Sequence, residues 1–222
     1  MRSRYTVASG TRHPINASEF TSLVGKQLRR SPYQLCVALD PYAIKGKFGA
    51  IGTLFKLELA DYGYTFVAKG TQSAHLYCLQ HESVVYSRLQ RLQGEVVPVY
   101  LGIVSLPKGY TFSGRVLIVH MMLMSWGGEV ARAVDTPNLA AEENRSTREV
   151  WNEGVIHGDS RKPNILWNEE RRRVMLIDFD RATFRQPLKH KQLSKVSGTD
   201  KKRKRQENVL EMLGKILQQN RA

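Results

Sequence analysis

The amino-acid sequence predicts an α+β protein with two lobes, in which a strand-rich first half is followed by a smaller helical half. Three observations predict this plan. Apolar and polar residues alternate through residues 53–60, apolar residues recur at helical spacing within 79–94, and short apolar segments separated by polar turns follow Gly154. The length of 222 residues, with 41% hydrophobic and 24% charged residues, suits one ordinary globular domain or two small lobes that share a core.

The first half contains four predicted strands. TLFKLELA (53–60) alternates strictly, the turn DYG (61–63) follows it, and YTFVAK (64–69) is a second strand. VVPVYLGIV (96–104) and RVLIVHMML (115–123) predict two more.

Two helices are predicted among and after these strands. In LQHESVVYSRLQRLQG (79–94), Val85, Leu89 and Leu92 recur at helical spacing, and a glycine ends the pattern. Acid-rich residues 138–153 predict the second helix. The apolar pieces that follow it, VIH, NILW and RVMLIDF, predict short strands.

Positive charge is concentrated near the two ends of the chain. The net charge is +14, but six basic residues and one acidic residue lie in 1–30, and nine basic residues and one acidic residue lie in 185–205. The centre is therefore close to neutral, and any electrostatic role belongs to the flanks.

These flanks set the expected domain boundaries. We expect residues 1–32 to form a loosely structured basic arm with one short helix around 19–28, and residues 33–184 to form the folded core. A basic flexible loop is expected over 185–206 and an amphipathic C-terminal helix over 207–222.

The compartment is predicted from the basic run and from two absences in the sequence. KKRKR (201–205) is typical of a nuclear localisation signal or a nucleic-acid-binding patch, and equally of solvated surface. The longest apolar run, 116–126, is too short to cross a bilayer, and Cys36 and Cys78 are too few for a disulfide framework. We therefore expect an intracellular protein, cytoplasmic or nuclear, with no membrane partner.

The stretch from Gly154 to Asp180 carries the candidate chemistry. Asp159, Asn164 and Asp178 lie where apolar segments meet loops, and their side chains are hard oxygen donors of the kind that Mg²⁺ prefers. Phosphoryl transfer needs metal ions, a carboxylate that orients the attacking hydroxyl, and a cation on the phosphates.

Two motifs in this stretch resemble those of protein kinases. HGDSRKPN (157–164) resembles the catalytic loop H-R-D-x-K-x-x-N, and DFD (178–180) resembles D-F-G. The resemblance implies that Asp159 is the catalytic Asp, that Asn164 and Asp178 hold magnesium, and that Arg161 stands where kinases keep a phosphate-contacting Lys. It also implies ATP and Mg²⁺ as cofactors.

The upstream half supplies the remaining residues of this pattern. Lys69 ends YTFVAK, which resembles the V-A-I-K motif, and Glu82 falls on the apolar face of the predicted helix. A carboxylate there needs a partner, and Lys69 is the natural one unless Glu82 lies at the edge of the face and reaches solvent.

A glycine-rich segment precedes the first two of these strands. In GKFGAIG (46–52), Gly46, Gly49 and Gly52 would let backbone N–H groups approach the phosphates, although an ordinary glycine loop fits equally. LMSWGG (123–128) falls where a kinase hinge contacts adenine.

The resemblance covers roughly residues 45–184, with an N-lobe over about 33–124 and a reduced helical C-lobe from 125. The sequence around these motifs is most similar to that of fungal protein-kinase-like proteins. Its HGD and DFD variants also resemble the corresponding motifs of aminoglycoside and choline kinases. Gly158 and Asp180 depart from the protein-kinase pattern. Only 42 residues follow Asp180 and no A-P-E motif is present, so a minimal kinase, a pseudokinase and a truncated gene product all remain open.

The resemblance implies an ATP-dependent phosphotransferase that acts on a hydroxyl acceptor, with a protein Ser or Thr slightly favoured over a small molecule. The alternative is a catalytically inactive or weak pseudokinase that acts as an interaction module, for which the basic run 201–205 allows a nuclear location. A third class, nucleic-acid binding through the basic flanks, predicts a strongly salt-dependent affinity.

Overall fold

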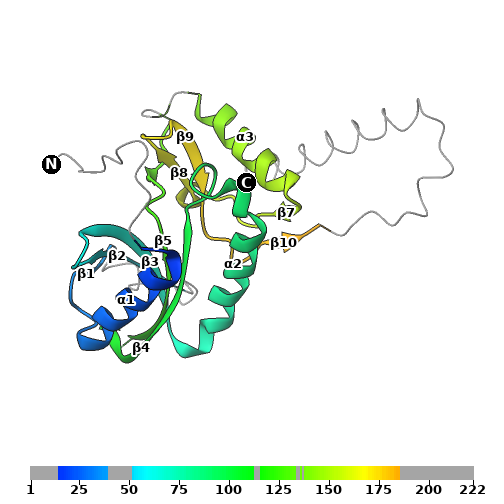
Figure 1. The fold of residues 1–222 in the computed structure, drawn as a ribbon. Coiled ribbons are helices and arrows are strands. Elements are labelled where there is room, and N and C mark those ends of the chain that lie inside the picture. Colours follow the sequence, from blue (N-terminus) through cyan, green and yellow to red (C-terminus); the bar gives the residue numbers. More distant parts are fainter. Residues whose placement is uncertain (1–14, 40–51, 113–115, 134–135, 137, 186–222) are drawn as a thin grey trace, which may run out of the picture. The chain divides into compact units, whose positions relative to one another are not determined.

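The structure is a computed structural model that describes residues 15–39, 52–112, 116–133, 136 and 138–185 (Figure 1). All of them belong to one compact unit that ends at Arg185. The α-helices in this part of the chain are α1 (Ala17–Arg30), α2 (Leu76–Arg88) and α3 (Leu139–Asn152). The strands are β1 (Cys36–Ala38), β2 (Thr53–Leu59), β3 (Tyr64–Thr71), β4 (Tyr100–Phe112), β5 (Val116–Met124), β6 (Glu129–Val130), β7 (Val155–Ile156), β8 (Ile165–Asn168), β9 (Arg173–Leu176) and β10 (Thr183–Phe184).

Several predictions concern residues outside these ranges. Among them are the glycines at 46 and 49, the basic run 201–205, most of the basic loop 185–206, and the C-terminal helix expected over 207–222. Within the described residues the chain is a mixed α+β protein, as the sequence predicts.

A five-stranded antiparallel sheet dominates the first half. Its strand order is β1-β2-β3-β5-β4, so β2, β3 and β5 are interior strands and β1 and β4 are edges. In β2, buried and exposed residues alternate, because only one face of this strand is covered. The last six residues of β3 and the last four of β5 are all buried, which requires cover on both faces.

Two helices provide that cover on opposite faces of the sheet. Phe20, Val24 and Leu28 of α1 form one core cluster with alternate residues of the strands, including Phe66 and Ala68 of β3. The intervening residues of β3 and β5 face α2 and join a second cluster, which contains Val67, Met122 and Met124 together with Leu79 and Val85 of α2. The alternation of side chains along each strand thus separates the two cores.

Helix α1 differs from the loose arm expected for residues 1–32. It extends from Ala17 to Arg30 and begins at a capping box, in which Asn16 Oδ1 accepts from the Glu19 backbone N–H while Glu19 accepts from the Asn16 N–H. Gln27 also bonds the backbone of Glu58 and Ala60, at the end of β2 and just after it. The helix is therefore part of the folded core, because three apolar residues at helical spacing cover a sheet face.

The strand predicted over 96–104 begins later, at Tyr100. Val96 and Val97 are fully buried but lie in an irregular segment, where Gly94 N–H donates to Val97 O and Leu176 N–H donates to Val96 O. Burial in this segment comes from tertiary contacts with β9 and its surroundings, which an apolar pattern alone does not distinguish from a strand.

The second half contains α3 and short strands. Strands β6, β8 and β9 form a three-stranded sheet, and β7 pairs with β10. Val150 of α3, Val174 of β9 and Phe179 continue the core cluster that lies under α2. The predicted helix over 138–153 and the predicted short strands are confirmed. None of the helices in the described ranges has the length and apolar composition needed to cross a membrane.

The packing of α1 leads to a stability test. We expect Leu28→Ala to lower the free energy of unfolding by about 2–5 kcal/mol, because it empties a fully buried position. Lys26→Ala on the exposed side of the same helix should change it by no more than about 0.5 kcal/mol. Urea denaturation measures both, and equal small effects would show that α1 is not part of the cooperative core.

Candidate functional site

Lys69 of β3 and Glu82 of α2 form a buried ion pair. Lys69 Nζ donates to Glu82 Oε1, and only 1% of the Glu82 side chain is exposed. The sequence predicts this pairing, and the alternative that Glu82 reaches solvent is excluded by its burial. The sheet and α2 meet at this contact, so the pair joins two elements of the fold.

Asp178 is the second partner of the same ammonium group. Its Oδ1 lies 2.5 Å from Lys69 Nζ, and 28% of its side chain is exposed. Asp178 adopts a left-handed backbone conformation, with φ of 68°, at the end of the segment that follows β9. A single buried cation therefore binds carboxylates from two distant parts of the chain.

Burial and charge act in opposite directions on this group. Burial lowers the pKa of Lys69, but the carboxylates of Glu82 and Asp178 outweigh it and hold that pKa above its ordinary value. Burial raises the pKa of Glu82, and the attraction of Lys69 offsets part of that rise. Lys69 therefore remains charged, and its charge stabilises the ionised forms of the carboxyl groups around it.

Asp159 lies in the loop between β7 and β8 and is held by Arg161. Arg161 donates to both carboxylate oxygens, from Nε to Oδ1 and from Nη2 to Oδ2, at 2.7 Å each. This pairing lowers the pKa of Asp159. The Asp159 side chain is 5% exposed and that of Arg161 is 66% exposed, so the guanidinium covers the carboxylate from the solvent side.

Asn164 fixes the same loop from within. Its Nδ2 donates to the Asp159 backbone O at 3.0 Å, and Ile177 N–H donates to the Asn164 backbone O at 3.1 Å. The contact with Ile177 ties the loop to the residue that precedes Asp178.

His157 makes a second tie between the two segments. Its Nε2 donates to Ile177 O at 3.0 Å, and its Nδ1 accepts from the Asp159 N–H at 3.3 Å. These bonds require the neutral ring, and burial lowers the pKa of His157 accordingly. Ring contacts continue from this histidine into the core: the His157 ring is tilted against Phe179, and Phe179 meets Tyr86 of α2 edge-on.

Asp180 joins Asp159 and Asp178 in an acidic group that the sequence reasoning missed. One carboxylate oxygen from each of the three lies within 4.8 Å of those of the others. Oδ1 of Asp180 is buried and has no hydrogen-bond partner in the described residues. The sequence does show an Asp two positions after Asp178. The motif comparison treats it only as a departure from D-F-G and assigns it no ligand role.

The candidate residues thus meet in one place where the structure describes them. Lys69, Glu82 and Asp178 are in direct contact, and Asp159 with Arg161 lies beside them. Gly52 also belongs here, because a Cβ at that position would lie 2.9 Å from Cγ of Lys69. Gly46 and Gly49 lie outside the described residues.

The structure gives a steric reason for a glycine at position 158, which the sequence motif does not show. Its φ is +79°, and a Cβ there would lie 2.3 Å from the backbone O of Arg181. The chain after Asp180 therefore passes directly over this position. A side chain such as the Arg found at this place in protein kinases does not fit here.

Comparison with known proteins gives a clear similarity over most of the chain. No family model matches the chain. The meiotic driver SPOK2 of Podospora anserina is 49% identical over 208 residues, which is 93% of this chain and 26% of that protein. The chain thus spans about a quarter of the length of the relative it matches.

The Lys69 cluster predicts a pH-dependent defect. We expect Lys69→Met to cost about 3–5 kcal/mol at neutral pH, because it leaves Glu82 buried and unpaired. The pKa of Glu82 is already above its ordinary 4.5 and would rise further without the ammonium. A carboxyl with a raised folded pKa contributes stability below its unfolded pKa and loses it as pH rises through the folded value.

The stability of Lys69→Met should therefore fall, relative to wild type, as pH rises above the ordinary Glu pKa of 4.5 toward the raised pKa of the folded state. The matched control is Lys69→Met with Glu82→Gln, in which the titrating group is gone and this fall should vanish. Urea denaturation across the range measures it. Parallel pH profiles for the two variants would contradict the assignment.

The contact at Gly158 gives a second test. Gly158→Ala should destabilise the fold by more than Gly63→Ala, which has a similar φ of +65° but nothing within 4 Å of the added Cβ. The control variant should lose only the backbone cost, about 1 kcal/mol, whereas Gly158→Ala must also displace the Arg181 backbone. Equal thermal stabilities of the two variants would show that the close approach of the Arg181 backbone adds nothing to the cost of Gly158→Ala.

Proposed function

We propose that this chain is a phosphotransferase of the protein-kinase-like superfamily, which transfers the γ-phosphoryl group of ATP to a hydroxyl acceptor. The observation that carries the proposal is the double contact of Lys69 with Glu82 and Asp178, with Asp159 and Asn164 in the adjoining loop. Residues separated by more than a hundred positions meet in the combination that phosphoryl transfer requires. The five-stranded sheet with α2 would be the first lobe, and the part from residue 125 a reduced second lobe.

The nucleotide would bind on the face of the sheet that carries Lys69. Leu54 is the direct register partner of Lys69 across β2 and β3, and it remains 40% exposed. Directly paired residues share a face, so an apolar surface adjoins the ammonium group. In the proposed function this surface would contact the base, and Lys69, held by Glu82, would contact the phosphates.

The acidic group fits a divalent cation. Three carboxylates lie within reach of one ion, and Oδ1 of Asp180 is buried without a partner, which is costly unless a cation or a donor completes it. Asp178 and Asn164 would hold Mg²⁺, and Asp180 adds a ligand to this pair. The ion would neutralise charge on the phosphates.

Asp159 would orient the acceptor. Its low pKa keeps it ionised, so it can accept the hydrogen bond of an incoming hydroxyl and its proton as the new O–P bond forms and the bond to ADP breaks. Arg161, which is largely exposed, would then offset charge on the transferred group.

A protein Ser or Thr is the favoured acceptor over a small molecule. Because the chain spans a quarter of the SPOK2 relative, the proposal concerns this segment and not a whole meiotic driver.

A specific observation favours the alternative, a pseudokinase that acts as a binding module. Both Asp159 and Asp178 are already neutralised by basic side chains of the same chain, at 2.7 Å and 2.5 Å. Such ion pairs would stabilise the fold of a binding module that transfers no phosphoryl group. The two possibilities differ in phosphoryl transfer and agree on the fold.

A thermal-shift titration with ATP tests the proposal. Saturating ATP with Mg²⁺, at about a hundred times its Kd, should raise Tm by about 5–10 °C, and ATP with EDTA should raise it less. Asp178→Asn should lose the Mg²⁺-dependent part. Asp61→Asn, in the exposed β2–β3 turn, should behave as wild type.

Transfer from γ-labelled ATP to a generic protein substrate then separates enzyme from binding module. Asp159→Asn should retain the thermal shift and lose transfer by about a hundredfold or more. Shifts without any transfer in wild type would favour the binding module. The absence of any shift in wild type would rule out the nucleotide site altogether.

A further inference from the structure

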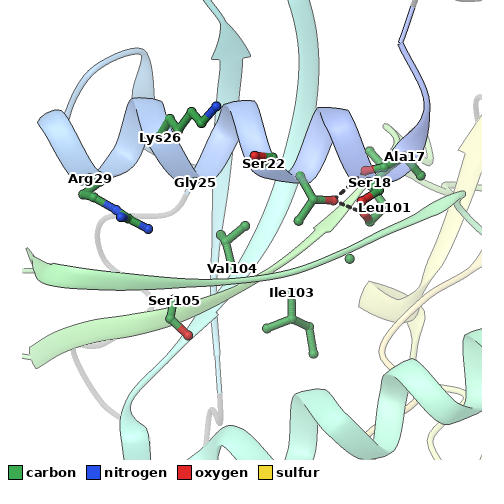
Figure 2. Close-up of a pocket in the computed structure, with 12 residues that line it drawn as sticks. Ala17, Ser18, Ser22, Gly25, Lys26, Arg29, Leu101, Ile103, Val104 and Ser105 are labelled. Carbon is green, nitrogen blue, oxygen red and sulfur yellow. Dashed lines mark hydrogen bonds between the residues drawn. The ribbon is translucent and has the colours of Figure 1, made fainter.

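A groove on the other side of the sheet has no place in the proposed function. Its volume is about 650 Å³, and it lies between the exposed side of α1 and the first half of β4 (Figure 2). Ser18, Ser22, Gly25, Lys26 and Arg29 line it from the helix, and residues 101–105 line it from the strand. Lys69 and Glu82 belong to the opposite face, so the groove is separate from the candidate site.

The strand side of this groove is an edge. In the described part of the chain β4 pairs with β5 alone, and its outer backbone groups have no neighbouring strand. At one point a side chain takes the place of such a strand, because Thr21 Oγ1 donates to Leu101 O at 2.6 Å. An edge with free N–H and C=O groups is a template for an additional extended segment.

Small residues keep the groove open along the helix. A Cβ at Gly25 would meet only Val104 Cγ1, at 3.9 Å, which is an ordinary contact distance. A larger side chain would therefore fit the backbone here but would fill the space above β4. Ser18 and Ser22 continue the same side of α1 with short hydroxyl side chains.

The charge of the groove has one sign. Lys26 and Arg29 are exposed, and neither has an acidic partner within the residues that the structure describes. By contrast, Arg145, Arg171 and Arg173 each pair with a glutamate. Among the residues that the structure describes, none of those lining the groove is acidic. Its two cations are thus available to a negatively charged ligand.

We propose that this groove binds an acidic, extended segment of another polypeptide, which adds to the β4 edge and places its carboxylates on Lys26 and Arg29. The strand edge supplies backbone hydrogen bonds, and the two cations select for acidic side chains. A polypeptide is favoured over single-stranded nucleic acid because the described lining of the groove includes no aromatic side chain to stack with bases. The inference is independent of the proposed function.

The test uses the full chain and a fluorescein-labelled peptide of alternating Glu and Thr, measured by fluorescence anisotropy. Lys26→Glu with Arg29→Glu should weaken binding by about tenfold or more, and Gly25→Leu should weaken it by filling the groove. The matched control is Arg30→Glu, on the same helix but outside the lining, which should stay within about twofold of wild type. Basic flanks are identical in all variants, so their contribution cancels.

Two further measurements identify the mode of binding. Hydrogen exchange at the amides of 101–105 should slow when the peptide binds, and a peptide N-methylated at alternate residues should bind about tenfold more weakly. Equal losses in Arg30→Glu and in the groove variants would overturn the proposal, as would unchanged exchange in β4. An oligo(dT) probe that binds more tightly than the peptide, with the same dependence on Lys26 and Arg29, would overturn it in favour of nucleic acid.

Discussion

The buried charge of Lys69 is the constraint on which the arrangement of this protein depends. An ammonium group with a side chain 10% exposed is costly unless carboxylates surround it. Glu82 and Asp178 meet that need, and they belong to α2 and to the segment after β9. The sheet, the helix on one of its faces and the second half of the chain must therefore come together at one point.

The cover of the sheet follows from the same alternation that places Lys69. Residues next to it in β3 point to the opposite face, where Ala68 is fully buried. That face needs its own cover, and α1 provides it with apolar residues one turn apart. Each face has a separate role as a result. One binds α2 and presents the ionic cluster, and the other holds α1 beside the open edge of β4.

Local pattern predicted most of the elements, and chemistry predicted the main contact. Glu82 on an apolar helix face could be assigned a partner because buried charge is costly. The packing of α1 was missed, although Asn16 and Glu19 form a recognisable capping box, because a short amphipathic pattern does not reveal which surface it covers. The need for Gly158 could not be predicted, since it arises from the path of the backbone at Arg181, far along the chain.

Two basic side chains offset part of the negative charge of this site, which helps its carboxylates to lie close together. Asp159 and Asp178 each bind a basic side chain, whereas Oδ1 of Asp180 is buried and has no partner among the described residues. Lys69 and Arg161 are the groups that a polyphosphate attracts, and the carboxylates are the groups that a cation attracts. Under the proposed function, a nucleotide with its metal ion would replace the internal partners of Lys69, Arg161 and the carboxylates. The internal ion pairs and the proposed ligand contacts would therefore use the same residues, so the ion pairs stabilise the site when no ligand is bound.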